Sequence, residues 1–377
     1  MFRYISVLAL LCGLIVPQWL GAQTIELDGG AKLRLTGRLQ VQYNTSSLSR
    51  SGEATVGTIP FSTFETRRAR LGVQADLSDW ITSQIEAEFA SRDVTLKNAY
   101  VDLAFDPRFG VRVGQFKKPF SLIELTSSTA IIPIERGLRI RGLSRSLLVP
   151  AVPGAPIPFP QLGGEPLLPE EQALVASLGY TGYDLGAEIH GEFRRFSYRA
   201  GAFNGNGGAA AQPGGHAFAG RLTYRPLPDR PLTLGAAASY LGRGAREEGV
   251  SPGRAGTAFE IDAEWGAFRR PGLHLIAEAA LGDNLVDERT FSGAQVIAAG
   301  FRPLGHPKLE GIEPLLRVSY GNVGHGRADD EGWLLTPGLN LYFGGRNRIM
   351  FNWEFFIPGS DRYDAANALR AQAQIHF

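Results

Sequence analysis

Basic residues are concentrated in one segment of the chain, between Phe116 and Gly164. It holds six basic residues against two acidic ones, Glu124 and Glu135, a local charge of +4. Arginine can bind a phosphate through two parallel hydrogen bonds, and rings of basic side chains favour anions in a narrow aqueous passage. The candidate anion-binding residues of a constriction are Lys117, Lys118, Arg136, Arg139, Arg141 and Arg145.

A second set of charges lies where polar and apolar residues alternate. If these residues face a common lumen, they line it with basic and acidic groups that set a field across it. The alternative is that they neutralise one another in pairs across neighbouring strands. The residues are Arg34, Arg38, Arg68, Arg70, Arg112, Glu86, Glu88 and Asp102.

The sequence offers no catalytic centre. Its six histidines are dispersed, and none lies in a nucleophile motif, so we predict no enzyme and no cofactor. The single cysteine, Cys12, excludes a disulfide framework and a cysteine-based metal site. The acidic run Asp329–Glu331 is interpreted as solvated rather than as a metal site. A net charge of +1 gives no reason to expect a nucleic-acid partner.

The elements that would position these charges follow a period of two. Residues 32–43 show it most clearly, with Leu33 and Leu35 on one face and Arg34 and Arg38 on the other, which is typical of a strand between apolar and aqueous surroundings. Sixteen such segments are predicted: 32–43, 68–77, 81–89, 98–105, 109–113, 183–193, 195–203, 217–225, 231–241, 257–267, 272–282, 292–302, 313–321, 333–343, 347–357 and 367–377.

Short turns and long loops alternate between these segments, as in an up-and-down outer-membrane barrel. Segments of about ten residues suit a tilted transmembrane strand, and aromatic residues gather near the segment ends. The last strand ends on an apolar face at Phe377, which we interpret as an assembly signal. We predict an all-β fold, a 16-stranded antiparallel transmembrane β-barrel, in preference to a soluble sandwich or propeller.

The domain organisation is one barrel behind a leader. Residues 1–22 combine Arg3, an apolar run and a small-residue end at Ala22, which indicates a signal peptide. Residues 23–377 form the barrel, and 116–180 form one long constriction-type loop. Five prolines between Ser146 and Gly164 exclude a helix there. We expect the loop to fold into the lumen; the alternative places it outside, against lipopolysaccharide or solvent.

Two motifs, 63–71 (TFETRRARL) and 113–121 (VGQFKKPFS), resemble those of the phosphate-selective porin O and P family. The resemblance covers nearly all of the chain after the leader. It implies a 16-stranded trimeric porin whose third loop folds inward and carries the constriction. The phosphate-specific members have lysine clusters there, whereas this chain has five lysines in all, and Leu143–Gly179 resembles an insertion.

Together these features predict a porin of the bacterial outer membrane, an anion-preferring diffusion channel for small solutes such as phosphate. The expected partners are small anionic or polar solutes, outer-membrane lipid and lipopolysaccharide, the β-barrel assembly machinery and two further copies in a homotrimer. The alternative is a structural or adhesin-like barrel without an open channel.

Overall fold

The computed structural model describes residues 24–26, 30–48, 59–90, 93–136, 175, 178–205, 215–242, 255–284, 289–322, 324, 331–359 and 366–377. The predicted signal peptide, Arg139, Arg141, Arg145 and most of the predicted insertion at 143–179 lie outside these residues.

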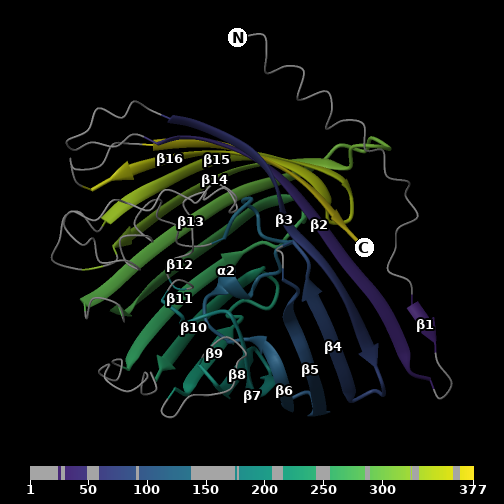
Figure 1. The fold of residues 1–377 in the computed structure, drawn as a ribbon. Coiled ribbons are helices and arrows are strands. Elements are labelled where there is room, and N and C mark those ends of the chain that lie inside the picture. Colours follow the sequence, from purple (N-terminus) through teal and green to yellow (C-terminus); the bar gives the residue numbers. More distant parts are fainter. Residues whose placement is uncertain are drawn as a thin grey trace.

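Sixteen long antiparallel strands close into a barrel (Figure 1). Each pairs with the next along the chain, including β6 with β7 across the long third loop. Strand β17 returns to pair with β2, from Asn367–Ser47 to His376–Arg38. The strands are β2 (Lys32–Leu48), β3 (Ile59–Asp76), β4 (Ile81–Glu88), β5 (Thr95–Asp106), β6 (Phe109–Lys117), β7 (Tyr183–Phe193), β8 (Phe196–Phe203), β9 (Ala217–Tyr224), β10 (Leu232–Leu241), β11 (Gly256–Trp265), β12 (Gly272–Asn284), β13 (Arg289–Pro303), β14 (Gly311–Asn322), β15 (Glu331–Gly344), β16 (Asn347–Pro358) and β17 (Ala366–His376).

The predicted 16-stranded barrel is therefore confirmed. One element was not predicted: a short strand, β1 (Thr24–Glu26), pairs with the beginning of β2. No helix among the described residues is long and apolar enough to cross a membrane.

The alternation in the sequence places apolar side chains on the outside of the barrel. Leu35, Ile85 and Ile261 are 44%, 59% and 65% exposed, whereas the inward-facing Gln40 and Gln42 are fully buried. This arrangement reverses that of a soluble sandwich, whose apolar face is buried, and it suits a barrel surrounded by lipid with a polar interior.

The barrel wall is lower on one side. Strand β4 is short, and the connection between β4 and β5 at residues 89–94 is short as well, although it lies at the end of the barrel that carries the long loops. Strand β3 consequently pairs with β4 only from Arg70 to Asp76. The preceding part of β3, residues 59–68, has no described strand beside it on that edge.

The described part of the third loop lies inside the barrel. It includes a single helical turn, α2 (Leu122–Leu125), which Figure 1 shows within the ring of strands. Backbone carbonyl groups of the loop accept hydrogen bonds from inward-facing side chains: Ser128 from Gln40, Thr129 from Gln374, Ile131 from Arg348 and Ile132 from Asn340. These bonds run along the inner wall from β2 through β17 and β16 to β15.

Candidate functional site

The third loop is held against the inner wall by two apolar contacts. At its base, Phe116, Phe120 and Tyr180 pack with Leu241 and Phe291 of the wall. Further along, Ile123 and Ile132 pack with Ile276, Ile297 and Leu315. Burying a large apolar side chain contributes about 1.5–3 kcal/mol, so these contacts favour one fixed position of the loop. We call the inner faces of β9–β17 and of β2 from Arg38 onward the covered wall.

A buried ionic network lies beneath the loop on the covered wall. The Glu354 carboxylate accepts from Arg317 at 3.3 Å and from Arg370 at 2.8 Å. Arg317 also donates to the backbone carbonyl of Glu135, and Arg370 donates to Asn44. Because these side chains are almost fully buried, each charge depends on its partners rather than on water.

The far end of the loop is tied to β3 through Glu135. Its carboxylate accepts two hydrogen bonds from Arg67, at 2.6 and 3.0 Å, and lies 3.6 Å from Arg68. Strict alternation would point Arg67 outward, but the register between β2 and β3 shifts at Gln40–Val41 and leaves Arg67 as an extra residue. Such a bulge can redirect a side chain, and here two successive arginines reach the same carboxylate.

The predicted lumen charges of β2–β6 are mostly paired. Arg34 lies 2.8 Å from Asp76, Arg38 lies 2.5 Å from Glu86, and Arg70 lies 3.1 and 2.6 Å from Glu86 and Glu88. Arg112 donates to Asp102 at 2.7 Å, and Arg68 donates to Gln40 at 2.8 Å. The structure thus has the local pairing that the sequence left open. We call the inner faces of β3–β7 and the beginning of β2 at Arg34 the open wall.

A cluster of cations lies where the loop faces the open wall. The Tyr183 hydroxyl accepts a hydrogen bond from Arg70 at 3.1 Å, and the ammonium groups of Lys97 and Lys117 lie 5.7 and 5.6 Å from the centre of the Tyr183 ring. Arg136 lies near enough to interact electrostatically with Tyr183 and Lys117. We call Lys97, Lys117, Arg136 and Tyr183 the Tyr183 cluster.

Three cations of this cluster differ from the arginines of the strands. Within the described part of the chain, Lys97, Lys117 and Arg136 form no ion pair with a carboxylate. Arg136 donates to the carbonyl groups of Ile123 and Thr126, and Lys117 donates to that of Glu124. Glu124 acts electrostatically on Lys117 and Arg136 without forming an ion pair with either. Because all three cationic side chains are only partly buried, a solute can reach them.

The structure separates the predicted constriction residues. Lys117 and Arg136 belong to the Tyr183 cluster, but Lys118 is 4% exposed, lies 3.7 Å from Asp184 and donates to the carbonyl of Gly179. Its ammonium group therefore ties the base of the loop to β7. At the opposite end of the barrel, the Phe377 ring lies over Gly37, whose backbone exchanges two hydrogen bonds with that of Phe377.

Lys97 and Arg67 were not predicted as site residues from the sequence. Both lie at register shifts, Lys97 opposite Glu86–Ala87 and Arg67 opposite Gln40–Val41. The available signal was a local break in alternation, since Lys97–Asn98 and Arg67–Arg68 each place two polar residues in succession.

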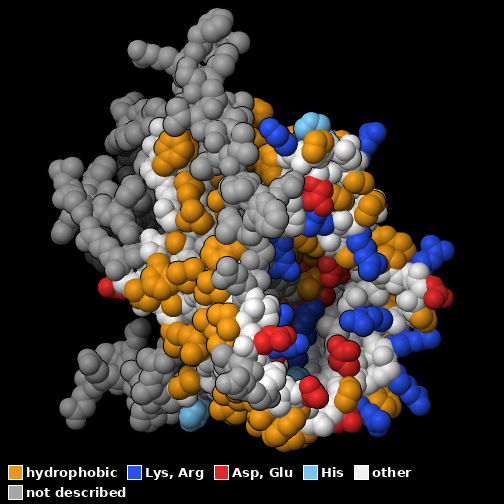
Figure 2. Space-filling view, turned by 90° about the vertical axis from the view of Figure 1, so that its right-hand side faces the viewer, with side chains coloured by type: hydrophobic (Ala, Val, Ile, Leu, Met, Phe, Trp, Pro, Cys, Tyr) orange, Lys and Arg blue, Asp and Glu red, His pale blue; other side chains and the backbone are white. Residues whose placement is uncertain are grey.

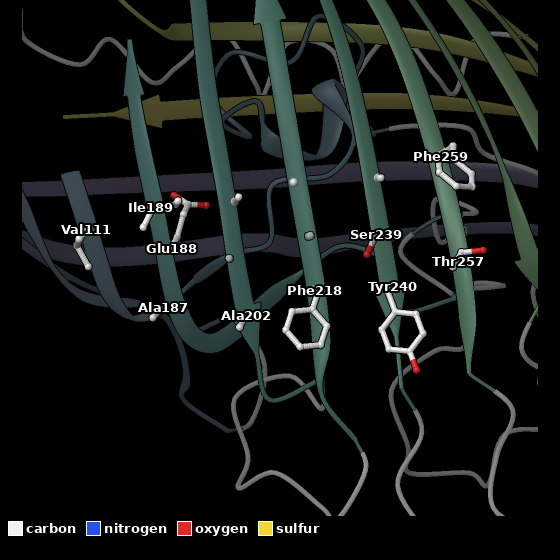
Figure 3. Close-up of a pocket in the computed structure, with 15 residues that line it drawn as sticks. Val111, Ala187, Glu188, Ile189, Ala202, Phe218, Ser239, Tyr240, Thr257 and Phe259 are labelled. Atoms are coloured by element: carbon white, nitrogen blue, oxygen red, sulfur yellow. The ribbon is translucent and has the colours of Figure 1, made fainter. Parts of the chain in front are cut away.

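The barrel also has a shallow apolar groove of about 640 Å³ on its outside (Figure 3). Its lining includes Ala187, Ala202, Ala238 and the rings of Phe218 and Tyr240. Because these residues belong to the exposed apolar face, the groove faces lipid and is separate from the lumen. Among the described residues, no three His, Cys, Asp or Glu side chains come together as a metal site would require.

The closed barrel, the apolar exterior and the inward loop define an outer-membrane channel. The family model for phosphate-selective porin O and P matches residues 34–259, more than half of the chain. The chain belongs to this family, and it is a porin channel of the bacterial outer membrane. No curated protein sequence matches it.

Solved structures of outer-membrane proteins show the same fold at low sequence identity. The anion-selective porin from Comamonas acidovorans is 12% identical, with a TM-score of 0.58 and coverage of 92% of this chain and 100% of that chain. OprB of Pseudomonas putida is 10% identical, with a TM-score of 0.59 and coverage of 91% and 94%. The trimer form of Vibrio cholerae OmpT is 14% identical, with a TM-score of 0.52 and coverage of 92% and 99%.

Proposed function

We propose that the channel prefers anions and that the Tyr183 cluster provides this preference. The observation that supports the proposal is the contrast in pairing: the arginines of the open wall are held by carboxylates, whereas Lys97, Lys117 and Arg136 have no described carboxylate partner. Three cations that no carboxylate holds in an ion pair can attract anions at short range in a water-filled passage. Small solutes such as phosphate are the expected cargo, and the channel has no catalytic role.

A reversal-potential measurement in a KCl gradient tests this proposal. The parent protein in a planar bilayer should show a potential of the sign expected for chloride permeation. Replacing Lys97, Lys117 and Arg136 with Gln should lower the anion-to-cation permeability ratio by several-fold. A difference of about 1.4 kcal/mol between the barriers for anions and cations would already change this ratio tenfold. A parent without anion preference would overturn the proposal.

The matched control removes three cations elsewhere. Arg194, Arg195 and Arg270 lie in exposed turns outside the lumen. Changing them to Gln alters the net charge by the same amount, but salt screens charges over about 10 Å at 0.1 M. The control should keep the parent's permeability ratio. Adding phosphate at constant ionic strength then tests the solute, because a phosphate that binds the cluster should reduce the chloride current.

We also propose a homotrimer in which neighbouring copies cover the low wall. Residues 59–68 of β3 leave a strand edge without a described partner on the β4 side, and unsatisfied backbone groups cost several kcal/mol in hydrocarbon. The structure described as a trimer form of Vibrio cholerae OmpT has the same fold. Crosslinking in outer membranes should give a three-copy species, and a single-copy species alone would contradict it.

Two further partners are proposed from the ends of the barrel. The β-barrel assembly machinery would recognise the terminal strand that ends at Phe377, and lipopolysaccharide would surround the end of the barrel with the long loops. Removing Phe377 should reduce the amount of protein assembled in the outer membrane. Unchanged amounts would show that the terminal ring is not a recognition feature.

A further inference from the structure

Exposed basic residues follow the short turns on one side of the barrel. The turns joining β7–β8, β9–β10, β11–β12 and β13–β14 lie at the end where β17 terminates, which is the periplasmic end because short turns face the periplasm. We call their exposed cations the basic belt: Arg194, Arg195, Arg230, Arg270, Arg302 and Lys308. Figure 2 shows Lys and Arg side chains in a row along its right-hand edge.

The belt is not neutralised by its own neighbours. Glu192, Asp229 and Glu310 are the acidic residues of these turns, and Glu310 is paired with Arg269. No belt residue forms an ion pair with a carboxylate of the described chain. Six cations without an ion pair, beside only two acidic residues that are not already paired, make a local excess of positive charge on one rim, whereas without Arg3 the chain holds 37 basic and 37 acidic residues.

The low-wall side of the same end lacks such a belt. Its two turns are residues 77–80 and 107–108, and their charged residues are Asp79, Asp106 and Arg108. Arg108 lies 3.6 Å from Asp106. Among these described turns, exposed basic residues without an ion pair are thus confined to the turns of strands whose outer faces lie away from the low wall.

The belt lies at the level of an aromatic girdle. Outward-facing Phe193 and Phe196 are 48% and 44% exposed, and the Arg194 guanidinium lies 5.2 Å from the Phe193 ring centre. Such girdles mark the headgroup level of the bilayer. Arg302 follows the outward register of Val296 on β13, so its side chain emerges on the lipid side of the wall.

We propose that the basic belt binds the headgroups of anionic phospholipids in the periplasmic leaflet. Guanidinium groups match phosphate oxygens through paired hydrogen bonds, and each basic residue near an anionic surface adds attraction. The lipid-facing side chain of Arg302 and the position of the belt at the aromatic girdle favour lipid as the partner. A soluble acidic protein would instead meet the turns from the periplasm. This inference does not depend on the ion preference of the channel.

Two tryptophans provide a matched pair of reporters. Trp265 pairs with Leu232, two residues beyond Arg230, and lies within the belt. Trp80 lies at the same end of the barrel, on the turn between β3 and β4. Two variants of the processed protein would each retain one of them, with the other tryptophans changed to Phe. Each is reconstituted in phosphatidylcholine vesicles that contain a small fraction of brominated phosphatidylglycerol or, in parallel, brominated phosphatidylcholine.

Enrichment of the anionic lipid at the belt should appear as stronger quenching. For Trp265, brominated phosphatidylglycerol should quench about two- to threefold more than brominated phosphatidylcholine at equal fraction. For Trp80 the two lipids should quench alike. Changing Arg230, Arg270 and Arg302 to Gln in the Trp265 protein should abolish the difference, as should 1 M NaCl.

Three outcomes would overturn the proposal. Equal quenching of Trp265 by both lipids would show that the belt does not select an anionic headgroup. Equal enrichment at Trp80 would show a general preference of the barrel rather than of the belt. A preference that survives the three substitutions would place the lipid site on other residues. The substituted protein should retain its parent's single-channel conductance, which confirms that it is folded.

Discussion

The covered wall and the open wall each hold an arginine–carboxylate pair, and the two pairs differ in their access to water. On the covered wall, the Arg317 and Glu354 side chains are 0% and 1% exposed, and the loop excludes water from them. On the open wall, the Arg34 and Asp76 side chains are 41% and 31% exposed. A buried pair loses much when one partner is removed, whereas an exposed pair contributes about 0–1 kcal/mol. Burial, and not the presence of an ion pair, thus sets how much each pair contributes to stability. Arg70 and Glu86 of the open wall are 8% and 3% exposed and belong with the buried pairs in this respect.

The largest expected effect follows from removing Glu354. Glu354→Ala deletes the carboxylate that Arg317 and Arg370 share in a dry environment. Breaking a buried pair in this way costs about 3–5 kcal/mol. Thermal unfolding in detergent, followed by the loss of the β-sheet signal or of fast migration on a gel, should occur at a clearly lower temperature. An unchanged transition would show that the loop does not shield this network.

A smaller effect is expected from releasing the loop at Glu135. Glu135→Gln weakens the contact with Arg67 and Arg68, so the loop should move and carry Arg136 with it. Single-channel recordings should then show added current fluctuations and easier passage of larger solutes. The barrel itself should unfold at nearly the parent's temperature, because the apolar contacts of the loop remain.

Glu124→Gln is the matched control for that experiment. It removes one negative charge from the same loop, and its side chain has no ion pair within the described residues. It should increase anion preference without adding fluctuations. If Glu135→Gln gives the same quiet current as Glu124→Gln, then Glu135 contributes charge only and does not position the loop.

The contact between Phe377 and Gly37 at the closure of the barrel provides a further test. A side chain added at Gly37 should lower the free energy of unfolding by about 1–2 kcal/mol. The Phe377 ring occupies the space beside Gly37, since an added Cβ would lie 2.2 Å from its ζ carbon. Gly37→Ala should displace the ring and lower the unfolding temperature modestly. Gly300→Ala is a suitable control, because a Cβ there meets no atom within 4 Å. Equal effects of the two changes would indicate that the ring is loosely held.

Much of the fold could be predicted, because the alternation of apolar and polar residues shows which face of each strand meets lipid. Leu33, Leu35 and Leu39 alternate with polar residues, and this pattern suffices to count strands and to infer closure. The inward path of the loop was also accessible, because Phe116–Phe120 opens a long segment with a local excess of basic residues.

The composition of the candidate site could not be predicted in the same way. Lys97 and Arg67 follow register shifts, which depend on the neighbouring strand and leave only a faint break in alternation. Lys117 and Lys118 are adjacent and chemically alike, yet only the fold places Asp184 beside Lys118. Pairing depends on contacts between residues far apart in the chain, so charge alone did not separate an anchoring cation from one that faces solutes.

The smallest expected effect belongs to the exposed pair of the open wall. Asp76→Ala leaves Arg34 without its carboxylate, but water can solvate the guanidinium, so the stability should fall by less than about 1 kcal/mol. The unfolding temperature should stay close to the parent's, and the anion preference should rise slightly because a cation at the lumen surface is no longer compensated. Raising the KCl concentration should remove that small gain, since exposed charges are screened. If Asp76→Ala were as damaging as Glu354→Ala, the Arg34–Asp76 and Arg317–Glu354 pairs would not differ in their access to water.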